Sequence, residues 1–263
     1  MNGIVTLLTD FGSRDPYVAA VKGVLLSINP ALTIVDITHE TSPQNIREAG
    51  FILASAYRHF PQGTLHLAVV DPGVGGERRG LAAATERYLF VGPDNGLFDW
   101  VFATDPPHQV VVLENPEYQL PQVSATFHGR DIFAPAAGHL SLGLPLEKLG
   151  PASQYRMHFA GRLLLKDQDT LEGEIIHVDR FGNLISNIEI PIAEAERRLQ
   201  DLEVSLATEK VLTGPATYEE APPLRPFALI GSSGLLEVSV RNDSAHKVTG
   251  CGVGTPVLVR RQR

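Results

Sequence analysis

The chain has 263 residues, of which 43% are hydrophobic, and its formal net charge is -8. This length and composition supply enough apolar side chains for one large domain or two unequal ones, and they exclude a disordered or fibrous protein. The acidic balance also argues against a nucleic-acid partner, because binding to a phosphate backbone requires clustered Lys and Arg.

The first half alternates short β-rich runs with segments of helical periodicity, which predicts an α/β domain with a mostly parallel sheet. Buried strands are expected at residues 4–8, 33–37 and 65–70. One helix is expected between the first two strands, and a second begins at Ser42-Pro43, where a serine cap precedes a proline at the first helical position. Runs at 81–84 and 88–91 are close enough to form a hairpin. We therefore expect a mixed sheet.

Periodicity is lost from about Pro145 to Asp169, where proline and glycine interrupt the chain. We predict an N-terminal α/β catalytic domain at 1–150, a linker at 151–168 and a smaller C-terminal domain at 169–263. Strands in the last part are expected at residues 173–178, 184–190, 227–230, 235–240 and 256–259, with one helix near 192–199. Spaced strands of this kind predict a small antiparallel β-barrel or sandwich.

Compartment and membrane contact can also be judged from the sequence. The single cysteine, Cys251, excludes an internal disulfide and fits a reducing compartment, so we expect a cytoplasmic protein. No apolar run reaches the roughly 18 residues that a membrane-spanning helix requires. The first residues enter an apolar strand pattern without a basic region, so we expect neither export nor membrane attachment.

Four polar segments lie at or just after predicted strands, where ligands bind in open α/β sheets. They are residues 9–12, 71–79, 92–96 and 126–131. Asp10 suits a turn as well as it suits a carboxylate that binds both hydroxyls of a ribose. The glycines after Asp71 match neither a phosphate loop nor a dinucleotide fingerprint, so they predict a tight turn, with Asp71 and Arg78 as a charged pair beside a ligand or in solvent.

His128 stands just before a segment of helical periodicity, where a titratable ring can meet a substrate. Taken alone, one of nine histidines is more often structural or exposed than catalytic. The sequence has no His-Glu-x-x-His, no His-x-His and no calcium-loop spacing. We therefore expect no metal site.

Six motifs, taken together and in order, resemble the S-adenosyl-L-methionine (SAM) hydroxide adenosyltransferases, which are relatives of the SAM-dependent fluorinases and chlorinases. They are Leu-Thr-Asp-Phe-Gly (8–12), Val-Asp-Pro-Gly-Val-Gly (70–75), Pro-Asp-Asn-Gly (93–96), Thr-Phe-His-Gly-Arg-Asp-Ile-Phe (126–133), Asp-Arg-Phe-Gly-Asn (179–183) and Ser-Ser-Gly-Leu-Leu-Glu (232–237). The similarity extends over nearly the whole chain. Residues 241–244 depart from the family pattern, which leaves the adenine-side contacts there open.

The resemblance implies a homotrimer in which the N-terminal domain of one subunit and the C-terminal domain of its neighbour enclose SAM, with adenosine as a product and no cofactor. It implies the following site residues: Asp71, Arg78 and His128 for catalysis, Asp10 for the ribose, Asp179 and Ser232 for the amino-acid end, Asn183 for the adenine edge and Phe181 as a wall for the base. Arg79 is one place off the family register and receives no role.

The implied reaction is hydrolysis of SAM to adenosine and L-methionine by in-line attack of water or hydroxide on the ribose 5′ carbon. Transfer of the adenosyl group to a halide such as chloride is one alternative, and non-catalytic binding of adenosine or SAM is another. The carboxylate of Asp71 would repel a halide, so the resemblance favours a water site. Whether His128 or Arg78 activates the water stays open.

Overall fold

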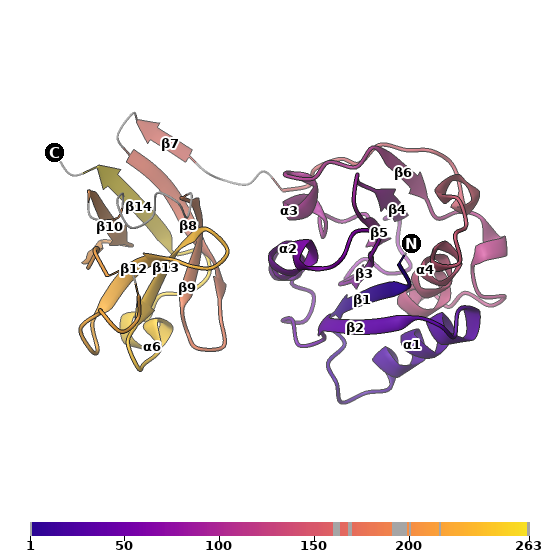
Figure 1. Ribbon diagram of the computed structural model, residues 1–263, viewed down its shortest axis with the longest axis horizontal. Coiled ribbons are helices and arrows are strands. Elements are labelled where there is room, and N and C mark those ends of the chain that lie inside the picture. The colour runs from indigo at the N-terminus through magenta and orange to yellow at the C-terminus, as the bar shows by residue number, and fades with distance from the viewer. Residues whose placement is uncertain are drawn as a thin grey trace. The chain divides into compact units, whose positions relative to one another are not determined.

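The computed structural model describes residues 2–159, 170–190, 199, 201–215 and 217–261, together with the backbone of residues 164–167. The chain divides into two compact units, Met1–Phe159 and Ala160–Arg263 (Figure 1). The division falls inside the predicted linker, and residues 151–159 belong to the first unit.

Residues 2–159 contain a mixed six-stranded sheet in the order β2-β1-β3-β5-β4-β6. Its strands are β1 (Ile4–Thr9), β2 (Thr33–Thr38), β3 (Leu65–Val69), β4 (Gly80–Ala84), β5 (Leu89–Pro93) and β6 (Gln109–Val112). β1 pairs in parallel with β2 and β3, and β3 pairs in parallel with β5. β4 is antiparallel to both β5 and β6, so the predicted mixed sheet and its hairpin are confirmed.

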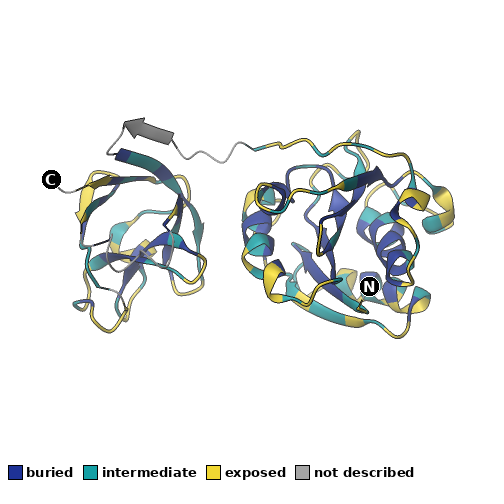
Figure 2. Cartoon of the chain, turned by 45° about the horizontal axis from the view of Figure 1, so that its top comes forward, coloured by how far each residue is buried: buried dark blue, intermediate teal, exposed yellow. Residues whose placement is uncertain are grey.

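Helices cover both faces of this sheet, and this explains why its central strands are apolar runs rather than alternating patterns. The helices are α1 (Tyr17–Ile28), α2 (Ile46–Ala56), α3 (Asp99–Phe102) and α4 (Ala134–Ser141). α1 and α4 pack on one face in a cluster that includes Val21 and Leu25, whereas α2 and α3 pack on the other in a cluster that includes Leu53 and Phe98. Figure 2 shows the central strands of this unit as a buried layer between the helices, whereas the edge strand β2 is partly exposed.

The second helix begins later than the sequence predicts. Its cap is Asn45, whose side chain accepts a hydrogen bond of 3.2 Å from the Glu48 amide, so the assignment of Ser42 as the cap is wrong. Gln44 has a φ of +65°, a left-handed conformation that cannot belong to the helix. The Gln44 amide instead donates to the Asp10 carboxylate at 2.8 Å. A contact with a residue distant in sequence therefore sets where this helix begins.

The described residues of the second unit form an eight-stranded antiparallel sheet in the order β11-β10-β14-β8-β9-β13-β12, with β7 paired to β8. The strands are β7 (Leu164–Asp167), β8 (Thr170–Val178), β9 (Leu184–Glu189), β10 (Leu202–Leu206), β11 (Glu209–Val211), β12 (Pro226–Ile230), β13 (Leu235–Val240) and β14 (Pro256–Arg261), and α6 (Ala245–Thr249) follows β13. A bridge between Leu212 and Phe227 joins the two edge strands, so the sheet is a nearly closed barrel. The predicted helix near 192–199 lies outside the described residues except for Leu199.

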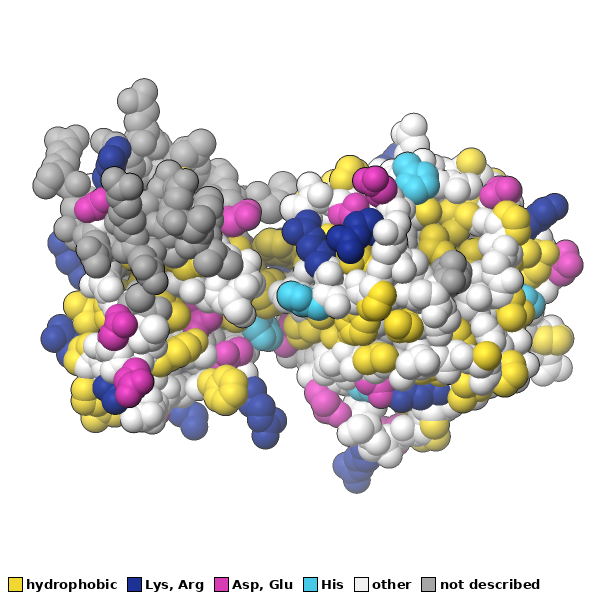
Figure 3. All heavy atoms as spheres, in the orientation of Figure 1, with side chains coloured by type: hydrophobic (Ala, Val, Ile, Leu, Met, Phe, Trp, Pro, Cys, Tyr) yellow, Lys and Arg dark blue, Asp and Glu magenta, His cyan; other side chains and the backbone are white. Residues whose placement is uncertain are grey.

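Figure 3 shows Lys and Arg side chains interspersed with acidic and apolar side chains on the visible face of the first unit. The described part of this face therefore lacks the continuous basic track that a phosphate backbone requires. Within the described part of the chain, each helix is too short or too polar to cross a membrane.

Candidate active site

The carboxyl ends of β1, β3 and β5 meet at one edge of the sheet, because these neighbouring strands are parallel. Asp10 follows β1, and Asp71 follows β3. β4 runs in the opposite direction and begins at Gly80, so Arg78 lies at this same edge. The topology thus gathers polar residues that are separated by about seventy positions in the sequence.

Asp71, Arg78 and His128 are in direct contact. Arg78 Nε donates to Asp71 Oδ1 at 2.8 Å, and Arg78 Nη2 donates to Asp71 Oδ2 at 2.5 Å. Nη2 also lies 2.8 Å from His128 Nδ1. The Arg78 and Asp71 side chains are only 12% and 5% exposed, so this chain of polar groups is largely shielded from solvent. Such shielding strengthens charge-assisted hydrogen bonds.

Two loops must approach closely for these side chains to meet, and Gly75 permits the approach. It has a φ of +76°, and a Cβ at this position would lie 2.2 Å from the carbonyl oxygen of Ala125. The loop after Asp71 therefore packs backbone against backbone on the segment that leads to His128. Glycine is the residue type that fits such a contact.

The segment around His128 is held by Asp131, which is fully buried. The Asp131 carboxylate accepts hydrogen bonds from the Ser124 amide at 2.8 Å and from Arg130 Nε at 2.6 Å. His128 immediately precedes a π-helical turn, Gly129–Phe133, that runs into α4. Turns of this type are frequent at functional sites.

The contact with Arg78 determines the tautomer of His128. A guanidinium has no acceptor, so His128 Nδ1 must accept the hydrogen bond, and the proton of the neutral ring lies on Nε2. Burial and the Arg78 charge lower the pKa of His128, against the opposing effects of Asp71, Asp131 and the Ser124 carbonyl. The imidazole is therefore neutral at pH 7 and acts as a donor through Nε2. Arg78 and His128 together can stabilise an oxygen atom that carries negative charge.

Asp10 lies at the same sheet edge and uses one carboxylate oxygen, Oδ2, to accept the Gln44 amide. The structure assigns no partner to its other oxygen among the described residues. A half-exposed carboxylate with a free acceptor suits the hydroxyls of a sugar.

The candidate binding residues of the second unit fall in two turns. Asp179 organises the first turn, because its Oδ1 accepts the amides of Phe181 at 2.9 Å and Asn183 at 2.8 Å, and its Oδ2 accepts Asn183 Nδ2 at 2.9 Å. Asn183 is buried, whereas Phe181 is 78% exposed. Ser232 lies exposed in the turn between β12 and β13. An aromatic side chain with this exposure suits a surface that a planar ligand covers.

The structure also contains polar clusters to which the sequence assigns no role. Glu237 is buried in β13, where its carboxylate accepts the hydroxyls of Tyr218 at 2.5 Å and Ser239 at 2.8 Å. Its signal was a charged residue within an apolar strand pattern. At the sheet edge, Arg79 forms an ion pair with Asp94, which belongs to the Pro-Asp-Asn-Gly motif (93–96). The described residues contain no group of three or more His, Cys, Asp or Glu side chains that could hold a metal ion.

Comparisons with known proteins give a consistent result. The models of the SAM hydroxide adenosyltransferase N-terminal and C-terminal domains match residues 5–150 and 173–258. The chain is 43% identical over 261 residues to the (R)-S-adenosyl-L-methionine hydrolase of Thermus thermophilus, covering 96% of this chain and 98% of that protein. A fluorinase from Nocardia brasiliensis is more distant, at 30% identity over 260 residues, with 88% of this chain and 84% of that protein covered.

Among solved structures, an uncharacterized conserved protein from Thermotoga maritima superposes with a TM-score of 0.88 and 32% identity, covering 98% of this chain and all of that one. Two domain matches and a near-complete alignment at 43% identity exceed what a shared fold alone would give. The chain belongs to the SAM hydroxide adenosyltransferase family.

Proposed function

We propose that this chain hydrolyses SAM to adenosine and L-methionine. The observation that carries the proposal is the hydrogen-bonded chain of Asp71, Arg78 and His128 at the carboxyl edge of the sheet. Relatives that are named (R)-S-adenosyl-L-methionine hydrolase support the same reaction.

The chemistry suits these residue types. An oxygen atom of water or hydroxide forms a bond to the ribose 5′ carbon while the bond from that carbon to sulfur breaks, and its electron pair stays on sulfur. The leaving group is a neutral thioether, so it needs no general acid. The protein must instead align the nucleophile and exclude bulk solvent.

Each member of the triad has a distinct part in this proposal. Arg78 and the Nε2 proton of His128 donate to the attacking oxygen, which favours its hydroxide form. Asp71 accepts two hydrogen bonds from Arg78, one on each carboxylate oxygen, and thereby fixes the orientation of the guanidinium group. The proton that the water loses passes to solvent.

The remaining candidate residues bind the substrate in this proposal. Asp10 accepts from the ribose hydroxyls, Asp179 and Ser232 hold the amino-acid end, Asn183 meets the adenine edge and Phe181 covers the base. We also propose that the protein acts as a homotrimer in the cytoplasm, and that the reaction requires no metal or cofactor.

The test is to incubate the purified chain with SAM, without added metal, and to separate the products by chromatography. Adenosine and methionine should appear in equal amounts. Arg78→Ala and His128→Ala should each lower turnover by about 10²–10⁴-fold, the contribution typical of a positioned catalytic group, while adenosine affinity stays close to that of the unmodified protein. Lys22→Met, which removes a surface ion pair with Asp36 on the α1 side of the domain, is the control that retains activity.

Three outcomes would contradict the proposal. A halogenated nucleoside formed in the presence of chloride would indicate halide transfer. Thermal stabilisation by SAM without release of adenosine over hours would indicate a binding module. Loss of adenosine binding with turnover spared in the alanine variants would refute the assigned roles.

A further inference from the structure

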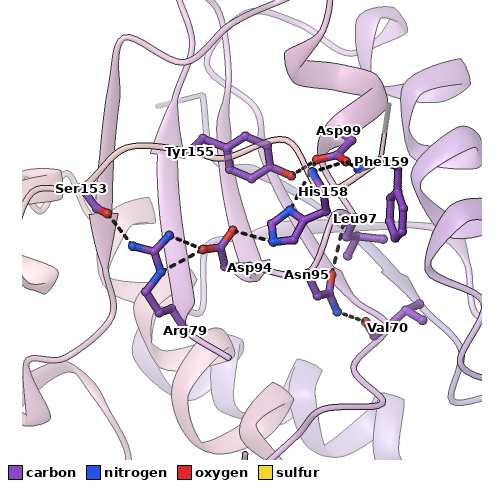
Figure 4. A network of polar contacts seen from close by, with 10 residues as sticks. All are labelled: Val70, Arg79, Asp94, Asn95, Leu97, Asp99, Ser153, Tyr155, His158 and Phe159. Atoms are coloured by element: carbon purple, nitrogen blue, oxygen red, sulfur yellow. Dashed lines mark hydrogen bonds and ion pairs between the residues drawn. The ribbon is translucent and has the colours of Figure 1, made fainter. Parts of the chain in front are cut away.

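Arg78 and Arg79 leave the same strand end in opposite directions. Arg78 reaches Asp71 and His128, as described above. Arg79 Nε donates to Asp94 Oδ2 at 2.9 Å, its Nη2 contacts the same oxygen, and its Nη1 donates to Ser153 Oγ at 2.7 Å (Figure 4). The backbone adds a further link, because the Asp94 amide donates to the Arg79 carbonyl at 2.9 Å. Arg79 is therefore fixed through both its side chain and its main chain.

The positive charge of Arg79 compensates the buried negative charge of Asp94. Its side chain is only 5% exposed, and Oδ1 is buried without a hydrogen-bond partner. The ring of His158 also lies near Asp94, but its Nε2 is 3.8 Å from Oδ1, beyond hydrogen-bond distance (Figure 4). A buried carboxylate without a counter-charge is strongly unfavourable. The Arg79–Asp94 ion pair therefore fixes the residue before β4 against the residue after β5.

Ser153, to which Arg79 donates, belongs to a segment (153–159) that makes further hydrogen bonds within the first unit. The Asp99 carboxylate accepts the Tyr155 hydroxyl at 2.5 Å and the amides of His158 and Phe159 at 2.8 and 2.6 Å (Figure 4). The Phe159 ring lies against Gly96, where a Cβ would be 2.3 Å from it. Arg79 therefore binds a segment that is itself held in place by hydrogen bonds to Asp99.

The loop on the other side of Arg78 is not anchored in this way. Most residues between Asp71 and Arg78 are exposed, and three of them are glycines. The last registered pair of the β4–β5 ladder is Gly80 with Pro93. Beyond this pair, the backbone and side-chain contacts between Arg79 and Asp94 hold the two chains together as far as the residue next to Arg78.

We propose that Arg79 is a positioning residue, which holds this strand end so that the Arg78 guanidinium contacts Asp71 and His128 together. The kinetic part of the inference rests on the proposed function. Small displacements of a catalytic group lower turnover strongly while leaving ground-state binding in place.

The state of His128 provides an independent readout. The charged groups that act on its ring are Arg78, Asp71 and Asp131, and of these only Arg78 lowers the pKa. Burial is the largest cause that lowers the pKa of His128, and the Arg78 charge is the second. If Arg78 moves away, this second cause is lost, and the pKa of His128 rises relative to the unmodified protein. The acid limb of the pH–rate profile then moves to higher pH. A residue that only stabilises the fold would not cause this shift.

The experiment compares Arg79→Met and Arg79→Lys with the unmodified protein. We expect Arg79→Met to lower kcat by about 10- to 100-fold with little change in KM, and Arg79→Lys to recover part of the loss because it restores a positive charge near Asp94. Arg87→Met is the matched control, because Arg87 lies beyond the opposite end of β4, against the Tyr88 ring, and should retain full activity. Should Arg79→Met fail to fold, Asp94→Asn tests the same contact while keeping an acceptor for Arg79.

Titration of the His128 ring by NMR separates the two proposals. A higher His128 pKa in Arg79→Met than in the unmodified protein is expected whether or not SAM is cleaved. An unchanged titration together with an unchanged kcat in a folded Arg79→Met protein would overturn the positioning role. Absence of adenosine release by the unmodified protein would refute the proposed function alone.

Discussion

Acid should destabilise the first unit through one buried histidine, His66. This residue has no exposed surface, and its Nδ1 lies 2.7 Å from the Thr6 hydroxyl. Its Nε2 has no partner among the described residues, and the ring stacks on Phe90 with centroids 5.1 Å apart. Burial lowers the pKa of His66 from 6.5 to about 3. The ring is therefore neutral in the folded protein at neutral and mildly acidic pH.

The sign follows from proton linkage. Between pH 6.5 and about 3, the unfolded chain binds a proton at His66 that the folded chain does not bind, so the free energy of unfolding falls as the pH falls through this window. The slope approaches about 1.4 kcal/mol per pH unit. Between pH 7.5 and pH 5, His66 alone should remove about 2 kcal/mol of stability.

The matched variant replaces His66 with Phe and its partner Thr6 with Val, since a lone Phe would leave the buried hydroxyl of Thr6 without a partner. Urea unfolding followed by the fluorescence of Trp100, the single tryptophan, reports on the first unit. Comparing the loss of stability between pH 7.5 and pH 5 in the two proteins cancels the effects of other groups. His59→Gln is the control, because His59 is exposed. Equal losses in the double variant and the unmodified protein would refute the reasoning.

Three further predictions concern the site. Gly75→Ala should lower both the melting temperature and turnover, because its Cβ would collide with the Ala125 carbonyl and separate the two loops; unchanged values in calorimetry and the product assay would contradict this. Phe181→Ala should weaken adenosine binding, measured by calorimetric titration, without altering the melting temperature, because the side chain is 78% exposed; equal affinity would remove Phe181 from the site. Turnover should fall as the pH drops through the lowered pKa of His128, since the protonated ring can no longer accept from Arg78; a pH–rate profile that stays flat down to the pH of unfolding would exclude this role.

The fold was predictable where local pattern decides structure. The runs that became β1 and β3 are mostly apolar over a strand length, and this pattern is typical of a strand buried within a sheet. The start of α2 was not predictable, because Gln44 has a left-handed conformation and its amide donates to Asp10, which is 34 residues away in the sequence. Long-range contacts of this kind have no local signature.

The site was predictable only in part. Resemblance selected Asp71, Arg78 and His128, but neither their spacing nor their residue types gave the 2.8 Å contact between Arg78 and His128. That contact depends on Gly75, whose local pattern indicates only a turn. The network around Asp94, which follows β5, and Asp99, the first residue of α3, joins these residues to a segment near 153–159 that lacks periodicity, so no pattern connects the two regions in the sequence.

The reaction itself is tested most directly by isotope labelling. SAM is incubated with the purified protein in water enriched in ¹⁸O, and both products are analysed by mass spectrometry. Attack of water on the 5′ carbon predicts one ¹⁸O atom in the 5′ hydroxyl of adenosine and none in methionine. Adenosine without the label, or no release of adenosine at all, would contradict hydrolysis at this site.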